Sequence, residues 1–124
     1  MLNPTTLFKA LVDETRLRCL MLMVKEDELC VCELGFAIGE SQPKISRHLA
    51  MLRKNEVVQD RREGQWIYYR IHPSLPDWAR TVIKGVADGA LEIDPFQDDQ
   101  KRLVTMPNRP VRCGCEDQDG ERCG

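Results

Sequence analysis

The sequence predicts a mainly α-helical fold with a small β-hairpin, arranged as a winged helix-turn-helix. Three observations predict it. Two short helical segments are separated by a turn at Gly39. The second of them has an apolar face opposite a polar and basic face. After it, apolar residues alternate at Ile67, Tyr69 and Ile71, beyond a turn at Gly64, which is typical of a β-hairpin.

The first part of the chain, residues 5–25, is expected to be helical with a joint near Val12. Asp13 is suited to cap the start of a second helix there. That second helix repeats apolar residues at the spacing of one helical face: Leu17, Leu20, Met21 and Val24. Because its other side is apolar too, we expect it to be buried on more than one face and Cys19 to be a core residue.

Residues 30–38 are predicted to form a short helix that ends at Gly39, and Ser41 to cap the next helix. Pro43 is tolerated in the first turn of that helix. A helical stripe faces the core: Ile45, Leu49 and Leu52. The hairpin that follows is interpreted as a wing.

A basic region occupies the middle of an acidic chain. Residues 44–70 contain seven Lys or Arg and three Asp or Glu, whereas the whole chain has a net charge of −2. This distribution is typical of a nucleic-acid surface, although a simple solvated charged face is the alternative. The predicted DNA-binding residues lie on the second helix and near the hairpin tip: Gln42, Lys44, Ser46, Arg47, His48, Arg61 and Arg62.

The segment after the hairpin carries a wide apolar stripe that favours a symmetric dimer. Packing on the N-terminal helices of the same chain is the alternative, and both can hold. The predicted interface residues are Leu7, Phe8, Leu75, Trp78, Val82 and Val86. Residues 1–93 are therefore predicted to form one DNA-binding and dimerisation domain. Residues 94–124 are polar and rich in Pro and Gly, and are predicted to form a flexible tail.

Composition argues against several classes of protein. The chain has no run of 18 or more apolar residues and no signal-peptide pattern, so we expect a cytoplasmic protein without membrane contact. The sequence contains neither a Gly-rich nucleotide-binding loop nor a Ser/His/Asp set, so we do not expect an enzyme. In a protein without an export signal, the six cysteines are expected to be reduced, redox-active or metal-binding.

Cys30 and Cys32 form the most informative motif. On a regular helix, residues two apart point about 200° away from each other, so one bound ion would have to unwind the first turn. That turn leads through Gly39 and Ser41 into the second helix, which offers a short route from ligand to DNA surface. Alternatively, the two cysteines serve only as small buried apolar residues. A second alternative is that they form a labile thiol-redox switch.

The chain resembles the arsenic-responsive, ArsR-type transcriptional repressors from about Leu7 to Val86. The likeness is carried by "LFKALVDETRLRCLMLM", "ELCVCEL", "SQPKISRHLAMLR", "DRREGQWIYYRI" and "LPDWA", in that order. It implies a homodimeric winged helix-turn-helix repressor on a palindromic operator. DNA binding would need no cofactor, and As(III) or Sb(III) would act as inducer by binding the thiolates of Cys30 and Cys32.

One ligand position departs from the family pattern. In the best-known members, a third cysteine lies where this chain has Gly35. Either two thiolates suffice, or a third comes from the tail, where the candidates are Cys113, Cys115 and Cys123. Lead and cadmium, which are also thiophilic, remain alternatives as inducers.

Overall fold

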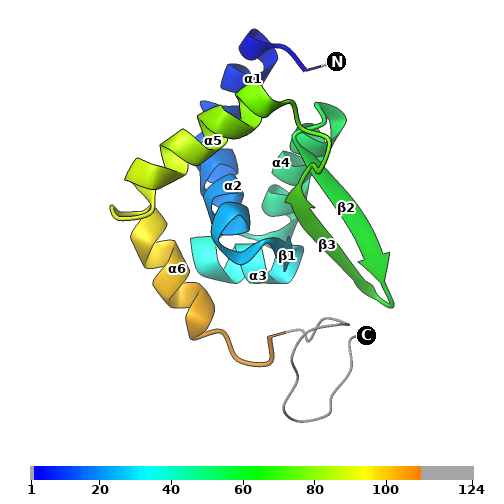
Figure 1. Ribbon diagram of the computed structural model, residues 1–124. Coiled ribbons are helices and arrows are strands. Elements are labelled where there is room, and N and C mark those ends of the chain that lie inside the picture. Colours follow the sequence, from blue (N-terminus) through cyan, green and yellow to red (C-terminus); the bar gives the residue numbers. More distant parts are fainter. Residues whose placement is uncertain (1, 110–124) are drawn as a thin grey trace.

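The computed structural model describes residues 2–109 and consists of helices around a small sheet (Figure 1). The elements in chain order are α1 (Pro4–Leu11), α2 (Glu14–Glu26), β1 (Glu28–Cys30), α3 (Val31–Ile38), α4 (Gln42–Lys54), β2 (Val58–Glu63), β3 (Trp66–Ile71), α5 (Asp77–Ala90) and α6 (Phe96–Val104). The predicted mainly α-helical fold with a β-hairpin is therefore confirmed.

Helix α2 lies at the centre of the fold, with α5 on one side and α3 on another (Figure 1). Its start is fixed by Asp13, whose carboxylate accepts a hydrogen bond from the Arg16 backbone N–H at 3.1 Å. Five consecutive residues from Cys19 to Met23 are buried. The joint after Val12 and the burial on several faces are thus as predicted.

The turn between α3 and α4 has the features that the sequence indicated. Gly39 ends α3 in the left-handed conformation, with φ of 82°, which glycine adopts without strain. Ser41 caps α4, and Ile45, Leu49 and Leu52 are fully buried. The opposite face of α4 is left toward solvent, as a helix-turn-helix requires.

The sheet has the strand order β1-β3-β2 and is antiparallel throughout. β2 and β3 form the predicted hairpin, with Glu63 opposite Trp66 at its turn. β1 was not predicted. It pairs Leu29 with Tyr69 and Cys30 with Tyr68 of β3, so the segment that carries the first thiol is bound to the wing.

Helix α5 packs on α2 through Ala79, Ile83 and Ala87, which are buried. The predicted dimer interface needs correction at Leu7 and Leu75, because the same protomer already buries both side chains. The apolar residues that the protomer leaves accessible include Phe8, 57% exposed, and Trp78, 39% exposed; Val82 and Val86 are half-buried.

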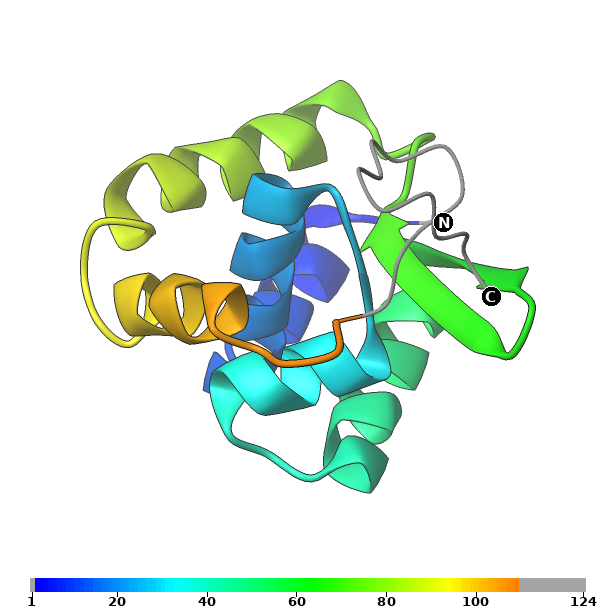
Figure 2. The ribbon, with the colours of Figure 1, turned by 90° about the horizontal axis from the view of Figure 1, so that it is seen from below.

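The prediction of a flexible tail from residue 94 is wrong for its first part. Helix α6 packs against α2 and α3, and Figure 2 shows it beside α3. Its Asp99 is 1% exposed at the side chain and accepts hydrogen bonds from Arg18 at 2.6 and 2.8 Å and from Arg102 at 3.0 Å. These two arginines also donate to the carbonyls of Ile38 and Ala37 at the end of α3. Ion pairing between distant segments therefore makes α6 part of the domain.

No helix in residues 2–109 combines the length and apolar character needed to cross a membrane. The tail cysteines Cys113, Cys115 and Cys123 lie outside the described residues.

Candidate functional site

Cys30 and Cys32 converge at the start of α3. Cys30 is the residue before the helix, in an extended conformation with φ of −94° and ψ of 168°, and Cys32 lies in the first turn. Their sulfur atoms are 2.7 Å apart. The expectation that the two thiols diverge, and that an ion must unwind the helix to reach both, is therefore wrong. It assumed that both residues were helical, whereas Cys30 ends β1.

The two thiols differ in burial. Cys30 is 1% exposed, and Cys32 is partly exposed. Burial, and then the contact with the Cys32 thiol, raise the pKa of Cys30, so this thiol is protonated at neutral pH. A ligand can thus reach the pair from the Cys32 side. Cys19 is separate from the pair, because it lies in the core on α2, where burial raises its pKa to about 12.

A buried carboxylate, Glu33, supports the thiol pair. The backbone N–H of Cys30 donates to Glu33 Oε1 at 2.9 Å. The other carboxylate oxygen of Glu33 accepts from Arg109 Nε, and Arg109 also pairs with Glu26 at 3.1 Å. These residues were not predicted from the sequence. The three-residue spacing from Cys30 to Glu33, which is that of a capping box, was the available signal for Glu33, whereas nothing in the sequence signalled Arg109.

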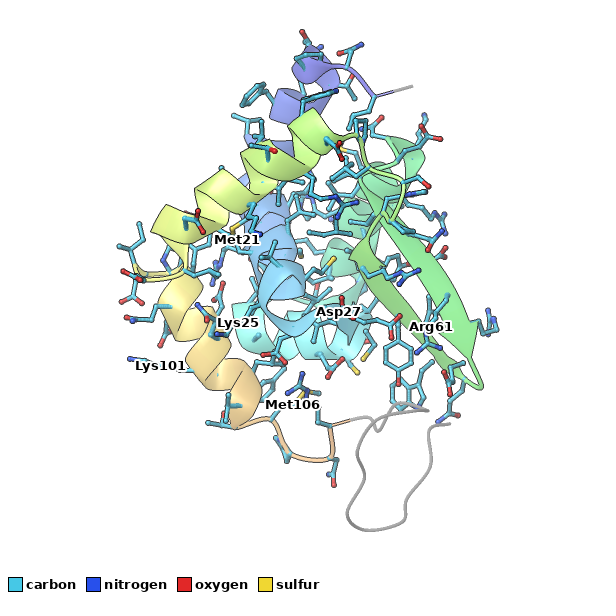
Figure 3. The ribbon with its side chains drawn as sticks, viewed as in Figure 1. Met21, Lys25, Asp27, Arg61, Lys101 and Met106 are labelled. Carbon is cyan, nitrogen blue, oxygen red and sulfur yellow. The ribbon has the colours of Figure 1, made fainter. Side chains whose placement is uncertain are left out.

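A surface hollow of about 410 Å³ opens beside Cys32. Its remaining lining comes from the α3–α4 turn and the segment after α6: Gly35, Phe36, Glu40, Ser41, Gln42 and Met106. Figure 3 places Met106 just beyond α6, and Figure 2 shows the following segment crossing α3. The thiol pair therefore has a neighbouring space that a bound group can occupy.

The outward face of α4 presents Gln42, Ser46 and Arg47 to solvent. Lys44 is partly exposed and pairs with Glu40 at 3.2 Å. His48 instead lies against α2: its Nδ1 is 3.3 Å from a guanidinium nitrogen of Arg16. The side chain of His48 is 17% exposed, and its burial lowers its pKa. His48, which was predicted to be a DNA-binding residue, thus packs between α4 and α2 instead of lying on the open face of α4.

The two wing arginines differ. Arg62 is exposed near the hairpin turn. Arg61, labelled in Figure 3, donates to both carboxylate oxygens of Glu28 at 2.7 and 2.8 Å and pairs with Glu63. Its guanidinium also lies 5.1 Å from the centre of the Tyr68 ring. Arg61 thus links the wing to β1, two residues before Cys30, while its side chain stays 40% exposed.

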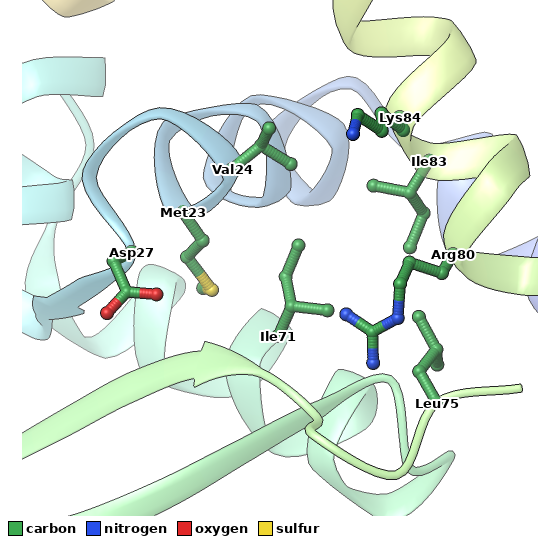
Figure 4. A pocket seen from close by; sticks show the side chains of 8 residues that line it. All are labelled: Met23, Val24, Asp27, Ile71, Leu75, Arg80, Ile83 and Lys84. Carbon is green, nitrogen blue, oxygen red and sulfur yellow. The ribbon is translucent and has the colours of Figure 1, made fainter. Parts of the chain in front are cut away.

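A second cavity, of about 320 Å³, lies between α2, β3 and α5 (Figure 4). Its lining is Met23, Val24, Asp27, Ile71, Leu75, Arg80, Ile83 and Lys84. None of these side chains is a thiol or an imidazole, so the cavity is not suited to a thiophilic ion.

The helix-turn-helix, its solvent-facing recognition helix α4 and the adjacent wing define a DNA-binding regulatory protein. Comparison with known proteins identifies the family. Residues 13–60 match the family described as "Bacterial regulatory protein, arsR family". The chain is 51% identical to the arsenical resistance operon repressor of Escherichia coli (strain K12), over 98% of this chain and 97% of the relative. It is 50% identical to the arsenic resistance transcriptional regulator ArsR1 of Pseudomonas putida, over 90% of this chain and 88% of the relative. The chain belongs to the ArsR family of transcriptional regulators.

Solved structures agree with this assignment. Reduced HlyU from Vibrio cholerae superposes with a TM-score of 0.61 at 31% identity, over 68% of this chain and 84% of that one. The antimony-specific transcriptional repressor AntR superposes with a TM-score of 0.57 at 30% identity, over 64% of this chain and 69% of that one. The predicted winged helix-turn-helix fold and ArsR-type resemblance are confirmed.

Proposed function

We propose that this protein represses an arsenic-resistance operon in the cytoplasm and leaves its operator when As(III) or Sb(III) binds Cys30 and Cys32. The convergence of the two sulfur atoms, 2.7 Å apart at the start of α3, carries this proposal. Trivalent arsenic and antimony are soft centres that prefer thiolates to oxygen or nitrogen ligands. The names of the relatives support the same ligand class, since two are arsenic-resistance regulators and one structural neighbour is antimony-specific.

The segments that carry the two thiols are connected to both elements expected to touch DNA. Cys32 lies on α3, which leads through Gly39 directly into α4. Cys30 ends β1, whose backbone is paired with Tyr68 in the wing. An ion that bonds both sulfurs fixes the spacing between β1 and α3, so it favours one relative position of wing and recognition helix. The inducer acts on DNA affinity only if that position differs from the DNA-bound one.

The DNA-binding residues proposed on α4 are Gln42, Lys44, Ser46 and Arg47, with Arg61 and Arg62 in the wing. Phosphate contacts by the four cationic members, Lys44, Arg47, Arg61 and Arg62, would make operator affinity decrease steeply with salt. We further propose a symmetric homodimer, because a palindromic operator presents two equivalent half-sites. The accessible side chains of Phe8, Trp78, Val82 and Val86 are its proposed contacts.

The tail cysteines are proposed as auxiliary ligands. Arg109 is held against the thiol site by the buried Glu33, and Cys113 follows four residues later. Four residues span at most about 14 Å, so Cys113 lies within that distance of Arg109 along the chain. Cys115 and Cys123 are further candidates. A truncation after Arg109 distinguishes the roles: unchanged arsenite response makes the tail dispensable, and complete loss makes a tail thiolate obligatory.

The direct experiment measures binding to a labelled fragment of the DNA upstream of the gene by fluorescence anisotropy, with and without arsenite. We expect the wild type to bind and to be released by arsenite. Cys30→Ser and Cys32→Ser should bind but resist release, because a serine hydroxyl is a hard, protonated donor. Cys19→Ser is the matched control and should respond like the wild type, provided that it folds. Normal release of the Cys30/Cys32 double variant contradicts the proposal.

A thiol-redox repressor of the same fold is the second candidate function, favoured by the same short distance between the sulfurs. It predicts release by peroxide and reversal by a dithiol reductant, in the absence of any metalloid. If another thiophilic metal, such as cadmium or lead, is the inducer, it should release the protein from operator DNA at a lower concentration than arsenite does.

A further inference from the structure

The segment after α6 reaches back to the thiol site through one side chain, Arg109. Its Nε donates to a carboxylate oxygen of Glu33, in the first turn of α3, and its Nη2 donates to Glu26, at the end of α2, at 3.1 Å. Figure 2 shows this segment crossing α3. Arg109 therefore bridges the two helices that flank β1, the strand that ends at Cys30.

Glu33 is a charged residue that the fold buries completely. Its side chain is 0% exposed, whereas the side chains of Arg109 and Glu26 are 28% and 30% exposed. Burial of a carboxylate is costly unless the group is both paired and hydrogen-bonded. Arg109 supplies a positive charge to Glu33, and the Cys30 backbone N–H supplies a hydrogen bond of 2.9 Å. Loss of the Arg109 charge therefore favours movement of the Glu33 carboxylate toward water and away from Cys30.

The hydrogen bonds between Cys30 and Glu33 are reciprocal. The Glu33 carboxylate accepts the Cys30 backbone N–H, and the Cys30 side chain accepts the backbone N–H of Glu33, which together make a capping box. The box holds Cys30 extended, with ψ of 168°, as the residue before the helix. If Cys30 became helical, its sulfur and that of Cys32 would point about 200° apart. The 2.7 Å approach of the two sulfurs thus depends on this box.

We propose that Arg109 is a positioning residue for inducer binding, an inference that rests on the proposed function. It acts through Glu33: the ion pair keeps the carboxylate at the Cys30 N–H, the capping box keeps Cys30 extended, and the two sulfurs converge before an ion arrives. A site that already has its binding geometry binds more tightly than one that must first rearrange. Loss of Arg109 therefore lowers inducer affinity although both thiols remain in the chain.

The first test is the arsenite midpoint for release of full-length Arg109→Gln from operator DNA. We expect the midpoint to rise about fivefold, which is the effect on an equilibrium of losing a helix cap. Lys101→Gln removes the same charge from an exposed position on α6, so it is the matched control and should leave the midpoint unchanged. Operator affinity without arsenite should be equal in the two variants, which separates positioning from a general loss of structure.

A double-variant comparison tests the route through the carboxylate. Glu33→Gln keeps an oxygen that accepts the Cys30 N–H but removes the buried charge that requires Arg109. In the Glu33→Gln background, Arg109→Gln should therefore shift the midpoint much less than it does in the wild-type background. An equal shift in both backgrounds overturns the inference, and so does a wild-type midpoint in Arg109→Gln.

A readout without arsenic distinguishes failure of this inference from failure of the proposed function. Exchange of the Cys30 backbone N–H with solvent deuterium, followed by NMR, reports on its hydrogen bond to Glu33. Exchange should be faster in Arg109→Gln and unchanged in Lys101→Gln, and equal protection in the wild type and Arg109→Gln overturns the inference. If arsenite fails to release the wild type while Arg109→Gln still speeds this exchange, the proposed function is wrong and the positioning of Cys30 by Arg109 stands.

Discussion

Replacing Asp99 with alanine should destabilise the domain strongly, although Asp99 lies in a segment that the sequence predicted to be flexible. Its carboxylate is 1% exposed and accepts two hydrogen bonds from Arg18 and one from Arg102. The side chain of Arg18 is only 15% exposed, so Asp99→Ala leaves a largely buried cation without its partner. Removing one member of a buried pair costs about 3–5 kcal/mol. Because Arg102 is 39% exposed, its lost contact adds little, and we expect a loss of about 3 kcal/mol in unfolding free energy.

Urea unfolding followed by circular dichroism measures this loss, with protein concentration held constant because a dimer's stability depends on it. The control is Asp98→Ala on the same helix, where the carboxylate is 50% exposed and pairs with Arg102 at the surface. That change should cost less than about 0.5 kcal/mol. Equal effects of the two substitutions would show that α6 is not held by the Arg18–Asp99 pair, and would refute our account of the C-terminal segment.

Three further predictions concern the recognition surface, the turn and pH. Arg47→Ala should weaken operator binding by about 1–3 kcal/mol and relax sequence preference, measured by anisotropy on operator and scrambled DNA. Unchanged binding would show that the recognition surface has been assigned to the wrong residues. Gly35→Ala should lower the thermal midpoint and weaken operator binding without inducer, because its Cβ would meet the Glu40 carbonyl; wild-type values for both would contradict the tight turn. Burial against Arg16 holds the pKa of His48 below its usual 6.5. As the pH falls below about 6.5, the unfolded chain takes up the proton before the folded protein does, so the free energy of unfolding should decrease. His48→Gln should flatten this dependence in denaturation curves taken at several pH values, and an equally steep decrease in that variant would assign the effect to other groups.

The helices that the sequence predicted are those whose ends are set locally. Asp13, Gly39 and Ser41 act through contacts within a few residues, so their positions alone identify the boundaries. β1 was missed because three residues carry no periodic signal, and this strand exists through pairing with β3, about 40 residues later. Helix α6 was not predicted either, because the ion pair that holds it joins Arg18 to Asp99 across 81 positions.

The residues of the candidate site, Cys30 and Cys32, were predicted correctly from their type, but the relative position of their sulfur atoms was not. Placing the helix start at residue 30 made Cys30 helical, and a shift of one residue reverses the conclusion about where its sulfur points. Leu7 was predicted to lie in the dimer interface, but its own protomer buries it. His48 was predicted to face DNA, but its ring lies against Arg16 of α2. The spacing of residues along a helix does not show which of them a neighbouring element will cover. The sequence states the type of each side chain, whereas the solvent exposure of that side chain depends on contacts between distant segments.

The most direct test of the account is the reciprocity between inducer and operator. If arsenite on Cys30 and Cys32 lowers operator affinity, operator DNA must lower arsenite affinity by the same factor, because the two equilibria share one coupling free energy. Calorimetric titration of arsenite into the free protein and into the protein–operator complex measures that factor, and operator titration with and without arsenite measures its counterpart. We predict equal factors, of at least about tenfold, for the wild type and loss of arsenite binding in the Cys30/Cys32 double serine variant. Equal arsenite affinity in the free and DNA-bound protein would contradict the claim that the thiol pair controls DNA binding.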